Sequence, residues 1–368
     1  MKRIASIDIF RALTMLMMLW VNDYAGMEGI PAWMQHAPAR QDMLGLSDIV
    51  FPTFLFCMGM SIPPAIESRL RKGQSLLRVG LHVLARCLAL IIMGVYEQNT
   101  CGEGYSLLMV VAFFLIWNSY PASEDWKRWL WLALRLCGIG ILVGLSISVW
   151  PMTTGWWGIL GLIGWAYLFS SILSLAFRKI GAALPLVWLA VIAMVILSNG
   201  AGIFRSLPGG WTDLGLAFSG AMCTCLMTSL DAKGKASRFP AWALPLAVLM
   251  AAGFVVCHKY WIISKIMGTP TWMFLCLAID LVAITLLHFV ADLKGHTAWA
   301  RPIKVAGTAT LTCYSLPYIW YAVRHFIHLY RPEALQYGGL GLVGSLLFAA
   351  MIILLAELLG KVGVKMKI

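Results

Sequence analysis

Residues 47–66 read SDIVFPTFLFCMGMSIPPAI, a run of twenty residues in which Asp48 is the only charged side chain. A run of this length and polarity is what a helix needs to cross the hydrocarbon core of a bilayer. It lacks the alternation of apolar and polar residues that marks a strand of a membrane barrel. Helices and closed barrels are the structures that satisfy their backbone polar groups in lipid, so the stretch predicts a membrane-spanning helix.

The rest of the chain repeats this pattern. Of its 368 residues, 61% are hydrophobic and 12% are charged, whereas soluble domains are about half apolar and a quarter charged. We therefore predict an all-α, polytopic integral membrane protein with a single transmembrane domain over residues 1–368. About twelve spans are expected, near residues 7–25, 47–66, 79–97, 104–120, 129–149, 156–177, 182–199, 212–230, 240–257, 272–290, 305–326 and 339–360. Two spans within 129–199 read as an extra helical hairpin, and ten or eleven spans are the alternative count.

The distribution of basic residues predicts the orientation. With the N-terminus in the cytoplasm, the inner connections hold 19 Lys and Arg residues and the outer connections hold 5. This asymmetry is the positive-inside pattern, so both termini are expected to be cytoplasmic. The net charge of +12 lies in short loops and not on one continuous basic stripe, which argues against a nucleic-acid partner.

The nine cysteines predict neither a metal site nor a disulfide framework. They include no CxxC pair and no Cys/His spacing typical of zinc, and most lie inside apolar runs. In such positions Cys behaves as a small hydrophobic residue.

Polar residues gather at the outer ends of the first two spans. Asn22 and Asp23 close the first span, His36 lies in the loop that follows, and Asp48 opens the second span. A neutral imidazole can accept and return a proton near neutral pH, and a carboxylate on its other nitrogen fixes the tautomer. The alternative is that His36 is an ordinary interfacial residue and Asp48 a helix cap.

Other polar residues within spans permit two interpretations each. Asp8 and Arg11 are three residues apart and share a helical face, which suits an anchoring ion pair. Asp280 and His288 are eight apart and are expected to face the interior as a buried polar pair. Tyr314 and Tyr318 recur at helical spacing, a pattern more typical of packing than of chemistry.

Several motifs resemble one known family. They are Ser6-Ile-Asp-Ile-Phe-Arg-Ala, Val21-Asn, His36-Ala and Leu46-Ser-Asp-Ile-Val-Phe-Pro, continued by Phe54-Leu-Phe-Cys-Met-Gly-Met-Ser-Ile. Weaker matches are Asp292-Leu-Lys-Gly and Gly307-Thr-Ala-Thr-Leu-Thr-Cys-Tyr. Together they resemble lysosomal heparan-α-glucosaminide N-acetyltransferase and its bacterial relatives. The opening S-x-D-x-F-R pattern is also similar to the wider transmembrane acyltransferases that modify surface glycans.

The resemblance implies acetyl transfer across a membrane, from cytoplasmic acetyl-CoA to a sugar, foremost an amino sugar, on the outer face. The family's active histidine falls on His36, its asparagine on Asn22 and its acid on Asp48. For a bacterial relative the resemblance implies the cytoplasmic membrane, with membrane lipid around the chain, and it leaves a homodimer open. The family's motif Arg-Ile-Pro-Gly-Val-Leu-Gln-Arg is absent, so its donor site does not carry over.

The leading hypothesis is thus a membrane acyltransferase that uses acetyl-CoA as donor and needs no metal. His36 would be the general base or the nucleophile, Asp48 would orient His36, and Asn22 would donate a hydrogen bond to the thioester oxygen. Arg78 and Arg86 are the expected donor-binding residues on the basic inner side, with Arg11 as a third candidate. The main rival is a transporter of sugars or amino sugars, and a structural scaffold protein is a third interpretation.

Overall fold

The computed structural model describes residues 4–121, 126–180, 183–201 and 207–368, and in these ranges it contains helices and no strands. The longer helices are α1 (Ala5–Tyr24), α2 (Leu46–Arg71), α3 (Leu76–Gln98), α4 (Glu103–Trp117), α5 (Lys127–Ser148), α6 (Gly158–Phe177), α7 (Ala183–Gly200), α8 (Trp211–Ala232), α9 (Phe239–Cys257), α10 (Pro270–Leu287), α12 (Thr310–Phe326) and α13 (Gly338–Lys361). Short helical segments are η1 (Ala32–Met34), η2 (Ala236–Arg238), η3 (His288–Leu293), η4 (Ala298–Ile303), α11 (Lys304–Thr308) and η5 (Glu333–Leu335).

Each predicted span contains a helix, with one correction. The expected span 305–326 is divided into α11 and α12 at Ala309, whose backbone leaves the helical region. Within the described residues, ten helices are long and apolar enough to cross a membrane, whereas α4 has 15 residues and α12 has 17. A perpendicular crossing takes about 20 residues, which sets these two helices apart from the others. The chain is a polytopic, all-α membrane protein.

Helices α2 and α8 form the centre of the bundle. In the apolar 18-residue stretch of each helix, 67% of α2 and 72% of α8 is buried inside the protein, compared with 17% of α5. The two central backbones touch because each helix places a glycine against the backbone of the other. A Cβ on Gly59 would lie 1.7 Å from the Ala217 carbonyl oxygen, and one on Gly220 would lie 2.0 Å from that of Phe56. Small residues at such crossings allow the close backbone approach on which helix packing in lipid depends.

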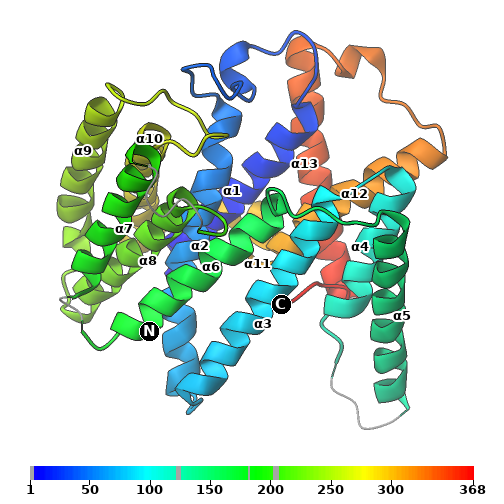
Figure 1. The fold of residues 1–368 in the computed structure, drawn as a ribbon, viewed down its shortest axis with the longest axis horizontal. Helices are drawn as coiled ribbons and strands as arrows, with labels where there is room; N and C mark the ends of the chain where they lie inside the picture. Colours follow the sequence, from blue (N-terminus) through cyan, green and yellow to red (C-terminus); the bar gives the residue numbers. More distant parts are fainter. Residues whose placement is uncertain (1–3, 122–125, 181–182, 202–206) are drawn as a thin grey trace.

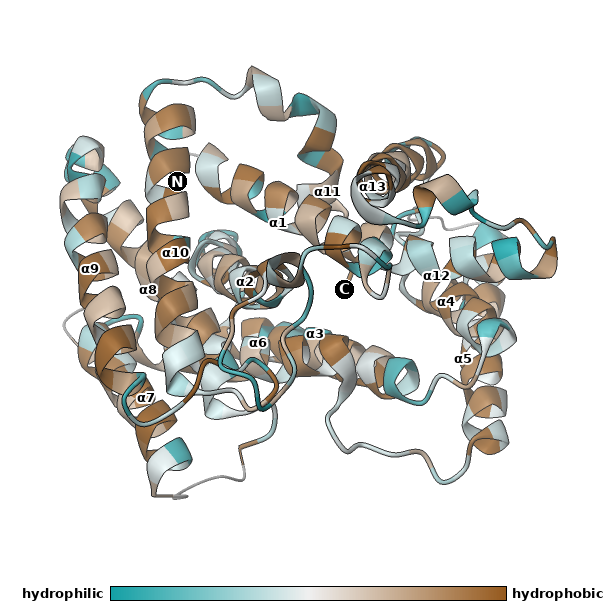
Figure 2. Ribbon diagram, turned by 90° about the horizontal axis from the view of Figure 1, so that it is seen from above, coloured by the Kyte–Doolittle hydropathy of each residue, from teal (hydrophilic) through white to brown (hydrophobic). Residues whose placement is uncertain are grey.

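The outlying helices present apolar surface outward. Figure 2 shows hydrophobic residues along the helices and hydrophilic residues mainly in the connections. On α5, Leu136 and Val143 are exposed, and on α9 so are Val248 and Leu249. Exposed apolar area on this scale is expected where lipid, and not water, surrounds the helices.

The region 129–199 is joined to the rest of the bundle by all three of its helices. Helix α5 packs on α4, α6 packs on α3, α8 and α2, and α7 packs on α8. The α3–α6 contact is another close glycine approach, since a Cβ on Gly94 would lie 2.2 Å from the Gly161 amide nitrogen. Helices α5 and α7 are mostly exposed, whereas α6 is 44% buried.

The bundle has two ends, which we call outer and inner after the orientation predicted from the sequence. The 25–45 loop and the α12–α13 connection lie at the outer end, the upper end in Figure 1, where the Gly338 amide donates to the Glu28 carbonyl oxygen at 3.0 Å. The α2–α3 turn lies at the inner end. There Asp292 accepts the amide hydrogens of Ala5 and Ser6 and caps α1. Of the basic residues that predicted the orientation, Lys2, Arg3 and Arg205 lie outside the described residues.

Candidate active site at the outer end

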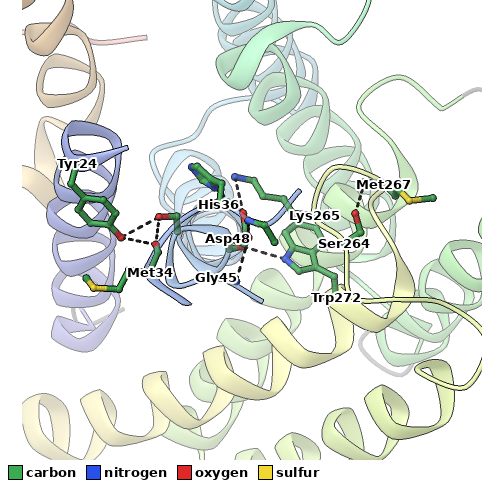
Figure 3. A network of polar contacts seen from close by, with 11 residues as sticks. Tyr24, Met34, His36, Gly45, Asp48, Ser264, Lys265, Met267 and Trp272 are labelled. Carbon is green, nitrogen blue, oxygen red and sulfur yellow. Dashed lines mark hydrogen bonds and ion pairs between the residues drawn. The ribbon is translucent and has the colours of Figure 1, made fainter. Parts of the chain in front are cut away.

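The 25–45 loop is fixed to the ends of α1 and α2. The hydroxyl of Tyr24 donates to the Met34 carbonyl oxygen at 2.8 Å, and the hydroxyl of Ser47 donates to the same oxygen at 2.6 Å (Figure 3). Where α2 begins, Gly45 passes so close to the loop that a Cβ would lie 1.8 Å from the Gln35 carbonyl oxygen. These contacts hold the backbone immediately before His36.

His36 and Asp48 form the central pair of the site. His36 Nδ1 lies 2.7 Å from Asp48 Oδ1, and the side chains are 42% and 3% exposed, respectively. An ionised carboxylate can only accept hydrogen bonds, so His36 donates from Nδ1. The Nε2 atom is then left with its lone pair on an exposed ring, which is the arrangement of a general base held by a carboxylate.

Asp48 also has the structural role that the sequence offered as an alternative. Its Oδ2 atom accepts the amide hydrogens of Ala37 at 2.8 Å and Gly45 at 3.3 Å, which closes a capping box at the start of α2. One carboxylate thus caps the helix with one oxygen and holds His36 with the other.

The sequence analysis missed a third charged group. Lys265, in the α9–α10 connection, places its Nζ atom 3.9 Å from Asp48 Oδ1 and is 22% exposed. Burial lowers the pKa of Lys265, and the carboxylates of Asp48 and Asp213 oppose that decrease. In the sequence Lys265 is one of the five basic residues of the outer connections, and the signal that it offers is its position in a short loop between apolar spans.

Asn22 does not join this pair. Asn22 precedes Tyr24 by two residues, so the two side chains point about 200° apart around α1. Since Tyr24 faces the His36 loop, Asn22 faces away from it. Asn22 instead lines an open outer cavity of about 770 Å³ between α1 and the α12–α13 connection. That cavity also contains an ion pair between Asp23 and Arg331 and the hydrogen bond from the Tyr321 hydroxyl to Asp23. The predicted catalytic role of Asn22 therefore stays a prediction.

Two of the three predicted donor-binding residues line an inner cavity of about 360 Å³, and the third does not. Arg11 and Arg86 both line it, whereas Arg78 lies exposed at the start of α3 and does not. Arg11 pairs with Asp8 at 2.9 Å, and the Arg86 guanidinium lies over the Tyr167 ring at 4.7 Å. The basic residues share this cavity with apolar side chains, among them Met15, Met18, Phe54, Met58, Leu90 and Leu160. It can hold a ligand with an anionic and an apolar part.

Two further polar groups differ from expectation. Asp280 and His288 are both buried but are not a pair: Thr53 donates to Asp280 at 2.6 Å, while His288 bonds to Asp292 at 3.0 Å. Tyr314 and Tyr318 are not only packing residues, because both hydroxyls donate to Glu97, that of Tyr318 at 2.7 Å. Tyr314 also lines the inner cavity. Spacing within one helix could not reveal partners on other helices.

Metal ligands do not gather in the described part of the chain. No three His, Cys, Asp or Glu side chains lie there as a metal ion would require. The nine cysteines are all free thiols, and six of them are buried, namely Cys57, Cys87, Cys223, Cys257, Cys276 and Cys313.

Comparison with known proteins supports the resemblance seen in the motifs. Residues 3–160 match a family model described as a domain of unknown function, DUF5009. The chain is similar to heparan-alpha-glucosaminide N-acetyltransferase of Mus musculus, at 28% identity over 190 residues, covering 42% of this chain and 28% of the mouse protein. The enzyme of the same name from Homo sapiens is 36% identical over 97 residues, covering 26% of this chain and 14% of the human protein. The similarity thus spans less than a third of either relative.

Proposed function

We propose that this protein is a membrane acyltransferase that moves an acetyl group from acetyl-CoA at the inner face to a sugar acceptor, foremost an amino sugar, at the outer face. The observation that carries the proposal is the His36–Asp48 pair, with its 2.7 Å contact and its exposed imidazole. The similarity to the two N-acetyltransferases supports it and supplies the reaction class.

In the proposed reaction His36 acts through Nε2. It accepts the proton of the acceptor's amine or hydroxyl while that nitrogen or oxygen attacks the thioester carbonyl carbon. The new C–N or C–O bond forms, the C–S bond breaks, and the proton passes from His36 to the departing thiolate. Asp48 holds the tautomer and stabilises the imidazolium that forms in between. In the alternative course Nε2 attacks first and an acetyl-imidazole carries the group to the acceptor.

The inner cavity is the proposed donor site. Arg11 and Arg86 would bind the donor's phosphates, and the apolar lining would take the uncharged arm that leads to the thioester. Phe54, which lines this cavity, follows Asp48 on α2 by six residues, or about 9 Å of helix rise. The cavity therefore extends along α2 toward the level of the outer pair. In this proposal Asn22 would bind the acceptor in the outer cavity that it lines.

The proposed setting is the cytoplasmic membrane of a bacterium, with both termini in the cytoplasm. The excess of basic residues at the inner connections supports this orientation. It places the exposed ring of His36 on the acceptor side and the two arginines on the donor side. A homodimer is the proposed assembly, and crosslinking in native membranes tests it.

The direct test is acetyl transfer in proteoliposomes, from labelled acetyl-CoA to glucosamine. His36→Ala is expected to reduce turnover by at least about 100-fold, the usual contribution of a positioned general base. His325→Ala is the matched control, because His325 is also exposed at the outer end of its helix. Arg86→Ala should raise the KM for acetyl-CoA, with Arg301→Ala as its exposed control. Full turnover by His36→Ala would refute the catalytic assignment.

The transporter hypothesis predicts a different result in the same vesicles. Counterflow of labelled glucosamine without any acetyl-CoA would support transport, and transfer of label from acetyl-CoA would support the enzyme. The buried Asp280 is the polar group within the spans that a transporter would use, and its Oδ2 atom has no hydrogen-bond partner among the described residues.

A further inference from the structure

The α9–α10 connection is attached to the His36 loop at several points. The Ser264 hydroxyl donates to the Ala39 carbonyl oxygen at 2.7 Å. Asp42 accepts a hydrogen bond from the Ile263 amide at 2.8 Å and lies 2.8 Å from His258 Nε2. These contacts bring Lys265, which lies between the attached residues and α10, to the side of Asp48 opposite Tyr24 (Figure 3).

Lys265 is not needed to satisfy the hydrogen bonds of Asp48. The carboxylate already accepts the Ala37 and Gly45 amides and the His36 ring. At 3.9 Å, Lys265 Nζ is also beyond the length of a direct hydrogen bond to Oδ1. What the ammonium contributes at this distance is its positive charge beside Asp48.

We propose that Lys265 is a positioning residue of the outer site, whose ammonium balances the charge on Asp48 Oδ1, the oxygen that His36 also contacts, so that Asp48 holds the His36 ring without favouring its imidazolium form. The catalytic purpose of Lys265 rests on the proposed function. Its effect on the protonation of His36 follows from the arrangement of the charged side chains alone. A carboxylate without this balancing charge favours the imidazolium form of the ring, which cannot accept a proton. With Lys265 present, Asp48 can fix the Nδ1–H tautomer without making the ring charged.

The neighbouring groups agree with this arrangement. Asp213, at the start of α8, faces Lys265 and favours its charged form. Tyr24 and Cys276 also face the cluster, and both side chains are neutral at pH 7 by their ordinary chemistry. The charged groups that contact this site are therefore Asp48, which His36 contacts directly, and Lys265, which lies beside Asp48.

The size of the effect follows from the two contacts. They share Asp48 Oδ1, so His36 Nδ1 and Lys265 Nζ are at most about 6.6 Å apart, the sum of 2.7 Å and 3.9 Å. A unit charge at this distance, at the effective dielectric constant of partly buried sites, shifts a titration by about one to two pH units. Removing the positive charge favours imidazolium, so the shift is toward higher pH.

The test is the titration of His36 by NMR of histidine-labelled protein in nanodiscs, with the resonance assigned by its loss in His36→Gln. Lys265→Met should move the midpoint up by about one to two pH units. Lys265→Arg should restore it. Lys259→Met, in the same connection but exposed, is the matched control. If Lys265→Met does not fold, Lys265→Gln replaces it as the neutral variant.

The outcomes separate the two proposals. An unchanged or lowered midpoint in the neutral variants refutes the role of Lys265 whatever the activity. A raised midpoint in a protein that transfers no acetyl group supports Lys265 and counts against the proposed function. Where turnover is measurable, the pH profile of kcat/KM should change as well: in Lys265→Met the midpoint of its acidic limb should move to higher pH by the same interval.

Discussion

Replacing Asp48 by Asn changes the site at one atom. The amide oxygen must take the place of Oδ2, since the Ala37 and Gly45 amides there need an acceptor. The amide NH₂ then takes the place of Oδ1 and faces His36 Nδ1, 2.7 Å away in the native site. Because an NH₂ group donates, Nδ1 must become the acceptor, and the ring proton moves to Nε2. Asp48→Asn thus removes the lone pair that the proposed mechanism uses.

The expected loss follows from the tautomer. A base in the wrong tautomer forfeits its general-base contribution, about 10²–10⁴-fold in turnover. The fold should lose less, because the cap of α2 keeps its acceptor. Lys265, only 22% exposed, loses one of its two carboxylate neighbours, which lowers the stability of the fold. The variant should therefore fold, with a lower melting temperature, and be nearly inactive.

The assay combines rate with tautomer. Initial rates of acetyl transfer in proteoliposomes give the loss of turnover, and ¹⁵N shifts of labelled His36 report which ring nitrogen carries the proton. A variant that retains the Nδ1–H tautomer would refute the reasoning from hydrogen bonds. One that switches tautomer but keeps turnover within twofold of the native protein would show that His36 is not the base.

Two further predictions concern stability. Gly59→Ala should lower the free energy of unfolding by about 3 kcal/mol or more, since its Cβ would lie 1.7 Å from the rigid Ala217 carbonyl oxygen. Thermal unfolding in detergent measures this loss. The control is Gly80→Ala, which has open space at its Cβ and should leave the stability nearly unchanged. The bonds of Asp42 to the Ile263 amide and to His258 hold the pKa of its carboxyl below the usual value, so their stabilisation is present above about pH 4 and is lost as pH falls through the lowered pKa. Hydrogen exchange of the α9–α10 connection should accelerate over that interval, and Asp42→Asn should remove the dependence; an unchanged rate in the native protein would contradict it.

The sequence by itself determined the class of fold and half of the site. Apolar runs of about twenty residues can be recognised in the sequence alone, because the thickness of the bilayer sets their length. In lipid their backbone N–H and C=O groups must bond to each other, which favours a helix. His36 and Asp48 could be paired from the sequence because His36 lies in the loop that leads directly into α2, where Asp48 is in the first turn. Only twelve residues separate the two.

Tertiary structure decided the rest. Position along a span could not tell that Asn22 faces the outer cavity and not His36, since one residue changes the direction of a helical side chain by about 100°. Nor could it tell that Arg86 lines the inner cavity while Arg78 lies outside it, or that Lys265 reaches Asp48 from a distant connection. These pairings depend on which helices touch. Glycine contacts such as Gly59 against Ala217 fix that choice, and each becomes visible only when both backbones are in place.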